Sequence, residues 1–180
     1  MKSFTGNFTQ QEGIPDSAIN KAIEVMRSGR LHRYNVDIGE KAEATQLELE
    51  FAQYQGSTFC LACASGGYAM QLALASIGLE HNEPVLTNAF TLSPVPGAIH
   101  NVGANPVLVE TTDQLVIDLD DLDKKIRSSD ARVFLLSHMR GHIVDMEKLC
   151  DLLETRAVLL IEDCAHTMGA SWNGRLSGTF

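Results

Sequence analysis

The spacing of hydrophobic residues changes part-way along the chain. Up to residue 56, apolar side chains recur at the three- to four-residue interval of an amphipathic helix in the segments 15–29 and 40–56, and each segment ends in a glycine. From residue 57 onward, short and almost wholly apolar runs alternate with amphipathic segments. The apolar runs predict strands and the segments between them predict helices: strands at 57–63, 84–87, 106–110, 132–137 and 157–161, and helices at 68–78, 94–103, 118–126 and 146–154.

Apolar strands that alternate with helices are typical of a parallel sheet covered by helices on both faces. We therefore expect an α/β domain over residues 57–180, preceded by an N-terminal helical arm over residues 1–56. In such a sheet, ligands bind beyond the carboxyl ends of the strands. These ends are followed here by ASGG, NAFTLSP, ETTD, SHMRGHIVD and EDCAH, which makes these segments the candidates for a functional site.

Composition narrows the class of protein. The chain has 180 residues, of which 44% are hydrophobic and 21% charged, a balance typical of globular domains. Its net charge of −9 and the lack of any Lys/Arg cluster argue against a nucleic-acid partner. Residues 1–13 contain no apolar stretch typical of an export signal, and no apolar run is long enough to cross a membrane. We therefore expect a cytoplasmic protein without a membrane partner.

The four cysteines invite a test for metal or redox chemistry. Cys60 and Cys63 form a C-x-x-C pair inside a β-prone run, whereas Cys150 and Cys164 stand apart in other apolar segments. Zinc would require a second ligand pair at a matching spacing, and redox chemistry would require the pair at the start of a helix. We therefore expect reduced thiols packed in the core, and no metal site.

A glycine pair lies where the first predicted strand leads into a helix, in the sequence ASGGYAM at 64–70. Glycines let a backbone approach a ligand closely, and a helix N-terminus offers free N–H groups and a positive dipole end to an anion. The segment matches neither the P-loop nor the dinucleotide fingerprint. Two interpretations stay open: a tight turn without a ligand, or a site for the phosphate of a small cofactor.

Ionisable residues follow the last predicted strand, in IEDCAH. A carboxylate at the position of Asp163 needs a cationic or hydrogen-bonding partner. It could cap a helix, pair with an arginine, or hold a proton on the ring nitrogen of a cofactor. His166 either donates to a cofactor oxygen or satisfies the loop backbone.

Another cluster of candidates lies after the fourth predicted strand, where His138, Arg140 and His142 occur in SHMRGH. Carboxylate and histidine residues do not have the spacing typical of a metal site there. This favours a loop that meets substrate or a neighbouring subunit. Asp145 precedes the next helix, which predicts an N-cap.

Taken in order, these motifs resemble the DegT/DnrJ/EryC1/StrS family of pyridoxal-phosphate (PLP) aminotransferases. The resemblance runs from the SGRL at 28–31 to the end of the chain, through CASGGYAMQLAL, PVLTNAFT, GANPVLVE, SHMRGHIVDMEKL and LIEDCAHTMGASWNGRLSGTF. It implies the large domain of the fold-type I PLP enzymes, here without its later strands, and a homodimer in the complete enzyme. Those later strands would pair with the segment 57–63.

The resemblance also implies roles for single residues. Ser65, Gly66 and Gly67 match the Ser-Gly-Thr segment that binds the PLP phosphate. Asp163 matches the aspartate that pairs with the pyridine nitrogen, and His166 matches a position that contacts the phenolic oxygen of the ring. On this basis Asp163 and His166 are the candidate catalytic residues.

Some positions depart from the family pattern. Gly67 replaces the usual threonine, which removes one hydroxyl contact to the phosphate. Leu92 lies where an aromatic side chain commonly stacks on the ring, and Phe90 lies two positions away. The lysine that binds PLP covalently is expected beyond Phe180, and no lysine of this chain matches it (Lys2, Lys21, Lys41, Lys124, Lys125 and Lys148).

The resemblance therefore implies an enzyme that transfers an amino group from a donor such as glutamate to a keto sugar, typically nucleotide-linked, in sugar, polysaccharide or secondary-metabolite biosynthesis. We interpret the chain as the N-terminal part of such an enzyme, inactive by itself, with a split enzyme as a second interpretation. Two alternatives stay open. One is a PLP-dependent sugar dehydratase of the same family, in which histidine replaces the lysine, and the other is a non-catalytic α/β binding module.

Overall fold

The computed structural model describes residues 5–7 and 12–180. Residues 1–4 and 8–11, which carry Lys2 and part of the stretch searched for an export signal, lie outside the described residues. The chain forms two compact units that meet at Glu50 and Phe51. The first unit holds helix α1 (Asp16–Ser28) and most of helix α2 (Glu43–Gln55). Gly29 ends α1 as predicted, because its φ of 70° is a left-handed conformation in which its N–H reaches the carbonyl oxygen of Met26.

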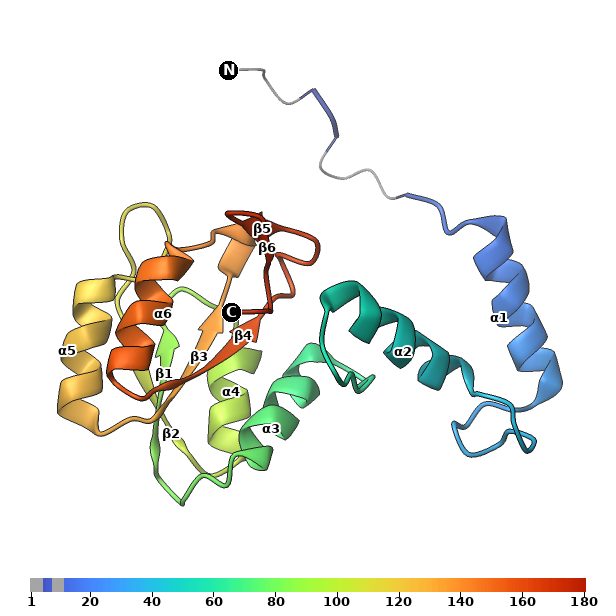
Figure 1. The fold of residues 1–180 in the computed structure, drawn as a ribbon, viewed down its shortest axis with the longest axis horizontal. Helices are drawn as coiled ribbons and strands as arrows, with labels where there is room; N and C mark the ends of the chain where they lie inside the picture. Colours follow the sequence, from blue (N-terminus) through green and yellow to red (C-terminus); the bar gives the residue numbers. More distant parts are fainter. Residues whose placement is uncertain (1–4, 8–11) are drawn as a thin grey trace. The chain divides into compact units, whose positions relative to one another are not determined.

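The second unit is built on a parallel sheet with the strand order β2-β1-β3-β4 (Figure 1). Its strands are β1 (Pro84–Asn88), β2 (Asn105–Val109), β3 (Val133–Ser137) and β4 (Leu159–Asp163). The expected α/β architecture with a mainly parallel sheet is confirmed. The bounds of all four strands lie within two residues of the predicted ones, and β1 and β4 extend beyond the predicted ends into polar residues.

Helices cover both faces of this sheet (Figure 1). Helices α3 (Gly66–Ser76) and α4 (Pro94–Asn101) pack against one face, and α5 (Leu119–Ser129) and α6 (Met146–Thr155) pack against the other. Alternate residues of each strand therefore enter different cores. One core includes Leu86, Phe134 and Leu136 with side chains of α5 and α6, and the other includes Val85, Val133 and Leu135 with side chains of α3 and α4.

The prediction of a strand at 57–63 is wrong, so the parallel sheet has four strands where five were expected. In this segment Phe59 is 87% exposed and Leu61 is 62% exposed. An apolar run becomes a strand only beside another strand that takes up its backbone N–H and C=O groups. In the described part of the chain, segment 57–63 is not a strand of the sheet. Cys60 and Cys63, expected in the core, are consequently only half-buried, as are Cys150 and Cys164.

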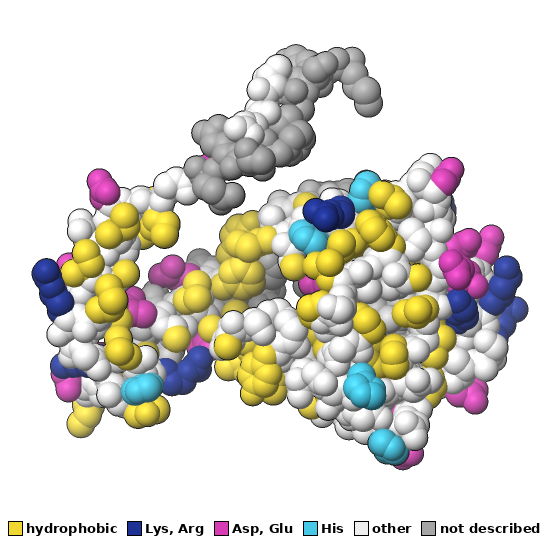
Figure 2. All heavy atoms as spheres, turned by 180° about the vertical axis from the view of Figure 1, so that it is seen from behind, with side chains coloured by type: hydrophobic (Ala, Val, Ile, Leu, Met, Phe, Trp, Pro, Cys, Tyr) yellow, Lys and Arg dark blue, Asp and Glu magenta, His cyan; other side chains and the backbone are white. Residues whose placement is uncertain are grey.

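The helices of the arm leave hydrophobic side chains exposed. α1 buries none of its residues, and Met26 on its predicted apolar face is 63% exposed. On α2, Leu47 is 56% exposed and Tyr54 is 52% exposed, whereas Ala52 is buried. Figure 2 shows hydrophobic side chains at the surface along this part of the chain. Helical spacing therefore predicted these helices correctly but not what covers their apolar sides.

A short antiparallel hairpin follows the sheet, formed by β5 (Ser171–Trp172) and β6 (Arg175–Leu176). Asn173 and Gly174 join the two strands with φ angles of 48° and 83°, the left-handed pair that a two-residue hairpin turn requires. The Asn-Gly dipeptide at 173–174 is a strong signal for this turn, although no hairpin was predicted there. None of the helices in the described part of the chain is long and apolar enough to cross a membrane.

Candidate functional site

The carboxyl ends of β1, β3 and β4 are joined by side chains of their last residues. Ser137 and Asp163 are directly paired at the end of the β3–β4 ladder. The Ser137 hydroxyl donates to Asp163 Oδ2 at 2.8 Å, and the Asn88 side chain reaches Ser137 from β1. These strand ends therefore meet at one edge, as expected for parallel strands.

Asp163 is half-buried and accepts hydrogen bonds on both carboxylate oxygens. Oδ2 accepts from Ser137, and Oδ1 accepts from the backbone N–H of Ala165 at 3.2 Å. Each oxygen keeps a lone pair for a further donor. One role considered for Asp163 was pairing with an arginine, and no arginine contacts it in the described chain. Its side chain instead contacts the Ser137 hydroxyl and the backbone N–H of Ala165 in the turn after β4.

His166 lies in the turn after β4 and is exposed. Its Nδ1 accepts a hydrogen bond of 3.2 Å from the backbone N–H of Arg140, which belongs to the short helix η1 (Met139–Gly141) after β3. Because Nδ1 accepts, the neutral imidazole carries its proton on Nε2, which remains a donor. The bond also joins the loops that follow β3 and β4.

Ser65, Gly66 and Gly67 form the N-terminus of α3. The Ser65 side chain is the N-cap and accepts from the Tyr68 N–H at 3.2 Å. A Cβ on Gly66 would meet no atom within 4 Å, and a Cβ on Gly67 would lie 3.5 Å from Cβ of Pro94. Pro94 begins α4 after the short loop that follows the carboxyl end of β1, so the start of α3 lies at the same edge as the strand ends. The first N–H groups of a helix have no intrahelical partner and can bind an anion.

Phe90 and Leu92 lie in the loop between β1 and α4. Phe90 is half-buried, and its carbonyl oxygen accepts from Asn88 Nδ2 at 2.9 Å. Leu92 is 51% exposed. The structure therefore places both at the edge where the strand ends meet, with the aliphatic side chain of Leu92 open to solvent.

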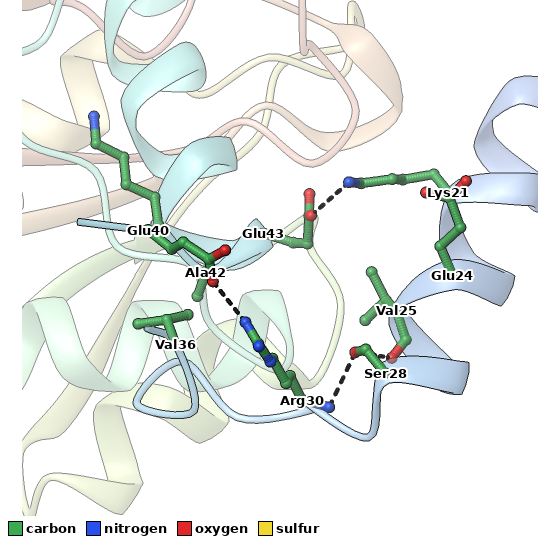
Figure 3. A pocket seen from close by; sticks show the side chains of 10 residues that line it. Lys21, Glu24, Val25, Ser28, Arg30, Val36, Glu40, Ala42 and Glu43 are labelled. Carbon is green, nitrogen blue, oxygen red and sulfur yellow. Dashed lines mark hydrogen bonds and ion pairs between the residues drawn. The ribbon is translucent and has the colours of Figure 1, made fainter. Parts of the chain in front are cut away.

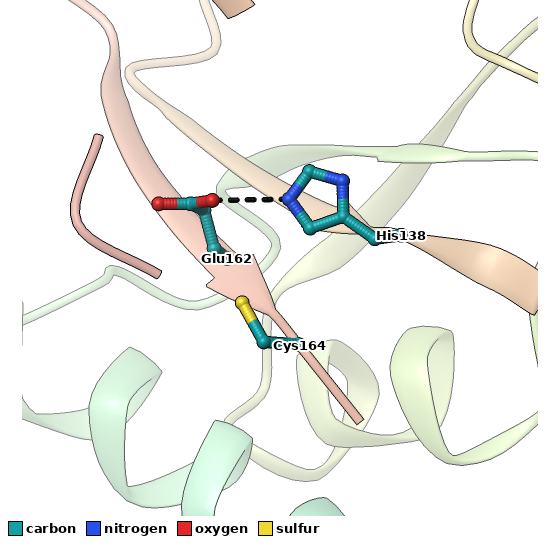
Figure 4. Close-up of side chains that lie close together, drawn as sticks. All are labelled: His138, Glu162 and Cys164. Atoms are coloured by element: carbon teal, nitrogen blue, oxygen red, sulfur yellow. Dashed lines mark hydrogen bonds and ion pairs between the residues drawn. The ribbon is translucent and has the colours of Figure 1, made fainter. Parts of the chain in front are cut away.

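His138 was expected in a loop that meets substrate or a neighbouring subunit, but its side chain is buried with 1% exposure. Its Nε2 lies 3.0 Å from Oε2 of Glu162, whose side chain is 5% exposed (Figure 4). The Glu162 carboxylate also accepts the backbone N–H groups of Gly178 at 3.0 Å and Phe180 at 2.9 Å. Glu162 therefore holds the segment after the hairpin against β4. By contrast, Arg140 and His142 are exposed.

The electrostatics of Glu162 follow from these contacts. Burial opposes ionisation, but the hydrogen bonds from His138, Gly178 and Phe180 outweigh it, so the pKa of Glu162 is lowered from its ordinary value. Glu162 is therefore ionised at neutral pH and acts only as an acceptor. Sequence reasoning missed this role because its donors come from residues 16 or more positions away.

Ligand atoms of His138, Glu162 and Cys164 lie within 4.8 Å of one another, a proximity that spacing in the sequence did not predict. The oxygens of Glu162 are used by N–H donors, and Cys164 Sγ accepts from the Ser177 hydroxyl at 3.2 Å. Burial raises the pKa of the Cys164 thiol, which the hydrogen bond from Ser177 only partly offsets. A protonated thiol is a poor metal ligand, and the Glu162 carboxylate already accepts from three N–H donors. We read the cluster as a structural anchor.

A separate hollow of about 580 Å³ lies within the arm (Figure 3). Several of its charged side chains are already paired: Lys21 with Glu43 at 2.9 Å and Arg30 with Glu40 at 2.6 Å, while Arg30 also pairs with the nearby Asp37 at 2.7 Å. Exposed ion pairs of this kind contribute little energy. The hollow is lined only by residues 21–43, which include none of the strand-end residues, so the strand-end edge is the better candidate site.

Comparison with known proteins shows the family to which the chain belongs. The model of the DegT/DnrJ/EryC1/StrS aminotransferase family matches residues 14–180. A dTDP-3-amino-3,4,6-trideoxy-alpha-D-glucose transaminase from Micromonospora megalomicea subsp. nigra is 34% identical over 142 residues, which are 79% of this chain and 37% of that protein.

Solved structures show the same fold. The crystal structure of 3-amino-5-hydroxybenzoic acid synthase matches with a TM-score of 0.84 and 27% identity, over 96% of this chain and 44% of that one. A GDP-4-keto-6-deoxymannose-3-dehydratase matches in fold with a TM-score of 0.81 and 22% identity, over 97% of this chain and 45% of that one. The chain thus spans less than half the length of these relatives.

Proposed function

The chain belongs to the DegT/DnrJ/EryC1/StrS aminotransferase family, and on this premise we propose that it forms part of the PLP site of an aminotransferase that acts on a nucleotide-linked keto sugar. The observation that carries the proposal is Asp163, a carboxylate at the end of β4 with acceptor capacity left on both oxygens. It lies at the sheet edge where α3 presents its N-terminus.

The residues at this edge fit the cofactor. The N-terminus of α3 has free N–H groups, and neither Gly66 nor Gly67 carries a side chain that would obstruct a phosphate. Asp163 would hold the proton on the pyridine nitrogen, and His166 would donate from Nε2 to the ring oxygen. When bound, PLP supplies an electron sink for the bond that breaks in the substrate. Phe90 and Leu92 would border the ring. Leu92 is at the position where the family commonly has an aromatic side chain but is aliphatic, and Phe90 is aromatic but lies two positions away.

The substrates are proposed from the relatives. A transaminase of a dTDP-linked amino sugar and GDP-perosamine synthases are among the proteins that the chain resembles. A keto sugar would receive the amino group, and an amino acid such as glutamate would donate it. We also propose a cytoplasmic homodimer, in line with the family, and the exposed apolar sides of α1 and α2 are compatible with burial in an assembly.

The covalent lysine would come from outside these 180 residues. The chain spans 37% of the transaminase relative, and the resemblance places the covalent lysine at none of this chain's lysines. This chain would then contact the phosphate and the ring nitrogen of PLP, and the lysine would come from another part of the enzyme. We propose that residues 1–56 form an N-terminal arm and that residues 57–180 belong to the PLP-binding domain.

A sugar dehydratase is the second candidate, favoured by the GDP-4-keto-6-deoxymannose-3-dehydratase that shares this fold. Both functions use a pyridine-nitrogen aspartate, and they differ at the lysine position beyond this chain. They also differ in product, because a dehydratase releases water from the sugar and leaves no amino group on it.

The experiment is a product assay with the full-length protein, PLP, glutamate and nucleotide-linked keto sugars. We expect mass spectrometry to find an amino sugar together with an equal amount of 2-oxoglutarate. A dehydrated sugar without nitrogen would establish the dehydratase instead. A protein that binds PLP and converts no sugar would contradict both proposals and favour a binding module.

A further inference from the structure

The hydroxyl of Ser137 is placed to fix the direction of the Asp163 carboxylate. Ser137 and Asp163 face each other at the last pair of the β3–β4 ladder, and Ser137 Oγ lies 2.8 Å from Asp163 Oδ2. Ser137 is 5% exposed, so water competes little for this hydrogen bond. A carboxylate only accepts, so the hydroxyl must point its proton at Asp163.

Asn88 in turn fixes the backbone of Ser137. The β1–β3 ladder pairs Leu86 with Phe134 and Thr87 with Leu135, and the Asn88 side chain continues it. Asn88 Oδ1 accepts from the Ser137 N–H, and Asn88 Nδ2 donates to the Ser137 carbonyl oxygen, each at 2.9 Å. Because Asn88 is 4% exposed and makes both bonds to one residue, it substitutes for a strand partner at this point.

The result is a hydrogen-bonded chain that runs Asn88–Ser137–Asp163 across three strand ends. An aspartate side chain otherwise rotates about two torsions, and the bond from the Ala165 N–H holds only Oδ1. Two donors on two different oxygens define the plane of the carboxylate. The remaining acceptor directions are then fixed before any ligand arrives.

We infer that Ser137 is a positioning residue that, supported by Asn88, orients the Asp163 carboxylate toward the ring nitrogen of the cofactor. The inference rests on the proposed function, because it assigns Asp163 the contact with that nitrogen. It goes beyond the proposed function in naming residues that touch neither cofactor nor substrate. A merely structural role for Ser137 would affect stability without turning the carboxylate.

The first test needs no cofactor. Crystal structures of the full-length protein without ligand would be compared for the parent, Ser137→Ala and Ser137→Thr. We expect the Asp163 carboxylate to rotate into another staggered conformation in Ser137→Ala and to stay in place in Ser137→Thr, which keeps the hydroxyl. Thr87→Val is the matched control, since Thr87 is buried on the neighbouring strand and its Oγ1 has no hydrogen-bond partner among the described residues. An Asp163 carboxylate that keeps its parent orientation in Ser137→Ala overturns the inference.

The second test separates this inference from the proposed function. NMR of PLP labelled with ¹⁵N at the ring reports whether that nitrogen is protonated in the loaded protein. We expect Asp163→Asn to abolish protonation at neutral pH, Ser137→Ala to reduce it, and Ser137→Thr and Thr87→Val to preserve it. Amino transfer by Ser137→Ala should fall about five- to fifteenfold, the equivalent of one hydrogen bond. If Asp163→Asn changes the signal and Ser137→Ala does not, only the positioning role is wrong, whereas no change in either variant would refute the assignment of Asp163 itself.

Discussion

Glu162 Oε1 accepts the backbone N–H of Phe180 at 2.9 Å, which ties the last described residue to the carboxyl end of β4. The other oxygen, Oε2, accepts from Gly178 and from the buried His138. One carboxylate thus joins β4, the start of the loop after β3, and the segment after the hairpin. This anchor lies one residue before Asp163, so it also fixes the strand from which Asp163 projects.

We expect Glu162→Gln to lower the free energy of unfolding by about 1–3 kcal/mol at neutral pH, because an amide accepts on one atom only and cannot serve the donors on both oxygens, among them the buried His138. The lowered pKa of Glu162 sets the pH dependence. Ionised Glu162 stabilises the fold above the ordinary glutamate pKa of about 4.3, and this contribution is lost as the pH falls through the lower pKa of the folded state. Urea unfolding at several pH values measures both effects.

Glu154→Gln, at an exposed glutamate on α6, is the control for this series and should change little at any pH. The gap between the parent and Glu162→Gln should narrow as the solution becomes acidic. A gap that widens on acidification would contradict the role assigned to the ionised carboxylate.

Gly67→Thr should tighten PLP binding by about five- to tenfold, the usual gain from one added hydrogen bond. The substitution supplies the hydroxyl that the family commonly has there. A Cβ at this position meets Pro94 at 3.5 Å, an ordinary contact, so the side chain can be accommodated. Fluorescence titration with PLP gives the dissociation constants.

Gly67→Ala is the matched control for that prediction. It adds the same Cβ and a similar restriction of the unfolded chain, but no hydroxyl. Equal affinities of Gly67→Ala and Gly67→Thr would show that the phosphate does not contact this position.

Cys164 should react slowly with iodoacetamide at pH 7, since burial raises the pKa of its thiol and the thiolate is the reacting form. Its alkylation should accelerate at alkaline pH. Mass spectrometry of the peptide that contains Cys164, followed over time, measures the rate against a small-molecule thiol. Alkylation at pH 7 as fast as that of the free thiol would be inconsistent with the hydrogen-bonded, protonated sulfur described for the cluster with His138 and Glu162.

The elements that the sequence predicted well are those whose pattern is local. The helices over 118–126 and 146–154 and the strands over 106–110 and 132–137 carry their own periodicity and caps, and Asp145 caps α6 as predicted by accepting from the Lys148 N–H. Segment 57–63 has a strand-like composition, but a strand also depends on a neighbour that the segment itself does not contain.

The contacts that orient the site could not be predicted in the same way. Asn88 and Ser137 are 49 positions apart, and Ser137 and Asp163 are 26 apart. Nothing in the sequence distinguishes these polar side chains from other residues at strand ends. They contact one another because β3 lies between β1 and β4 in the sheet. His138 likewise pairs with Glu162 on the neighbouring strand, so its buried side chain differs from the expectation of a loop that meets substrate or a neighbouring subunit.

The most direct test of the site is the rate of amino transfer by Asp163→Asn and His166→Ala in the full-length protein. An asparagine cannot stabilise a positive ring nitrogen, so we expect Asp163→Asn to slow amino transfer on the order of 10²–10³-fold, the usual cost of removing one preorganised electrostatic contact. Its PLP affinity should be largely retained, because the phosphate contacts at Ser65, Gly66 and Gly67 are separate. His166→Ala removes a single hydrogen bond and should be milder. Near-normal turnover of Asp163→Asn with an inactive His166→Ala would contradict the assignment of Asp163 as the partner of the ring nitrogen.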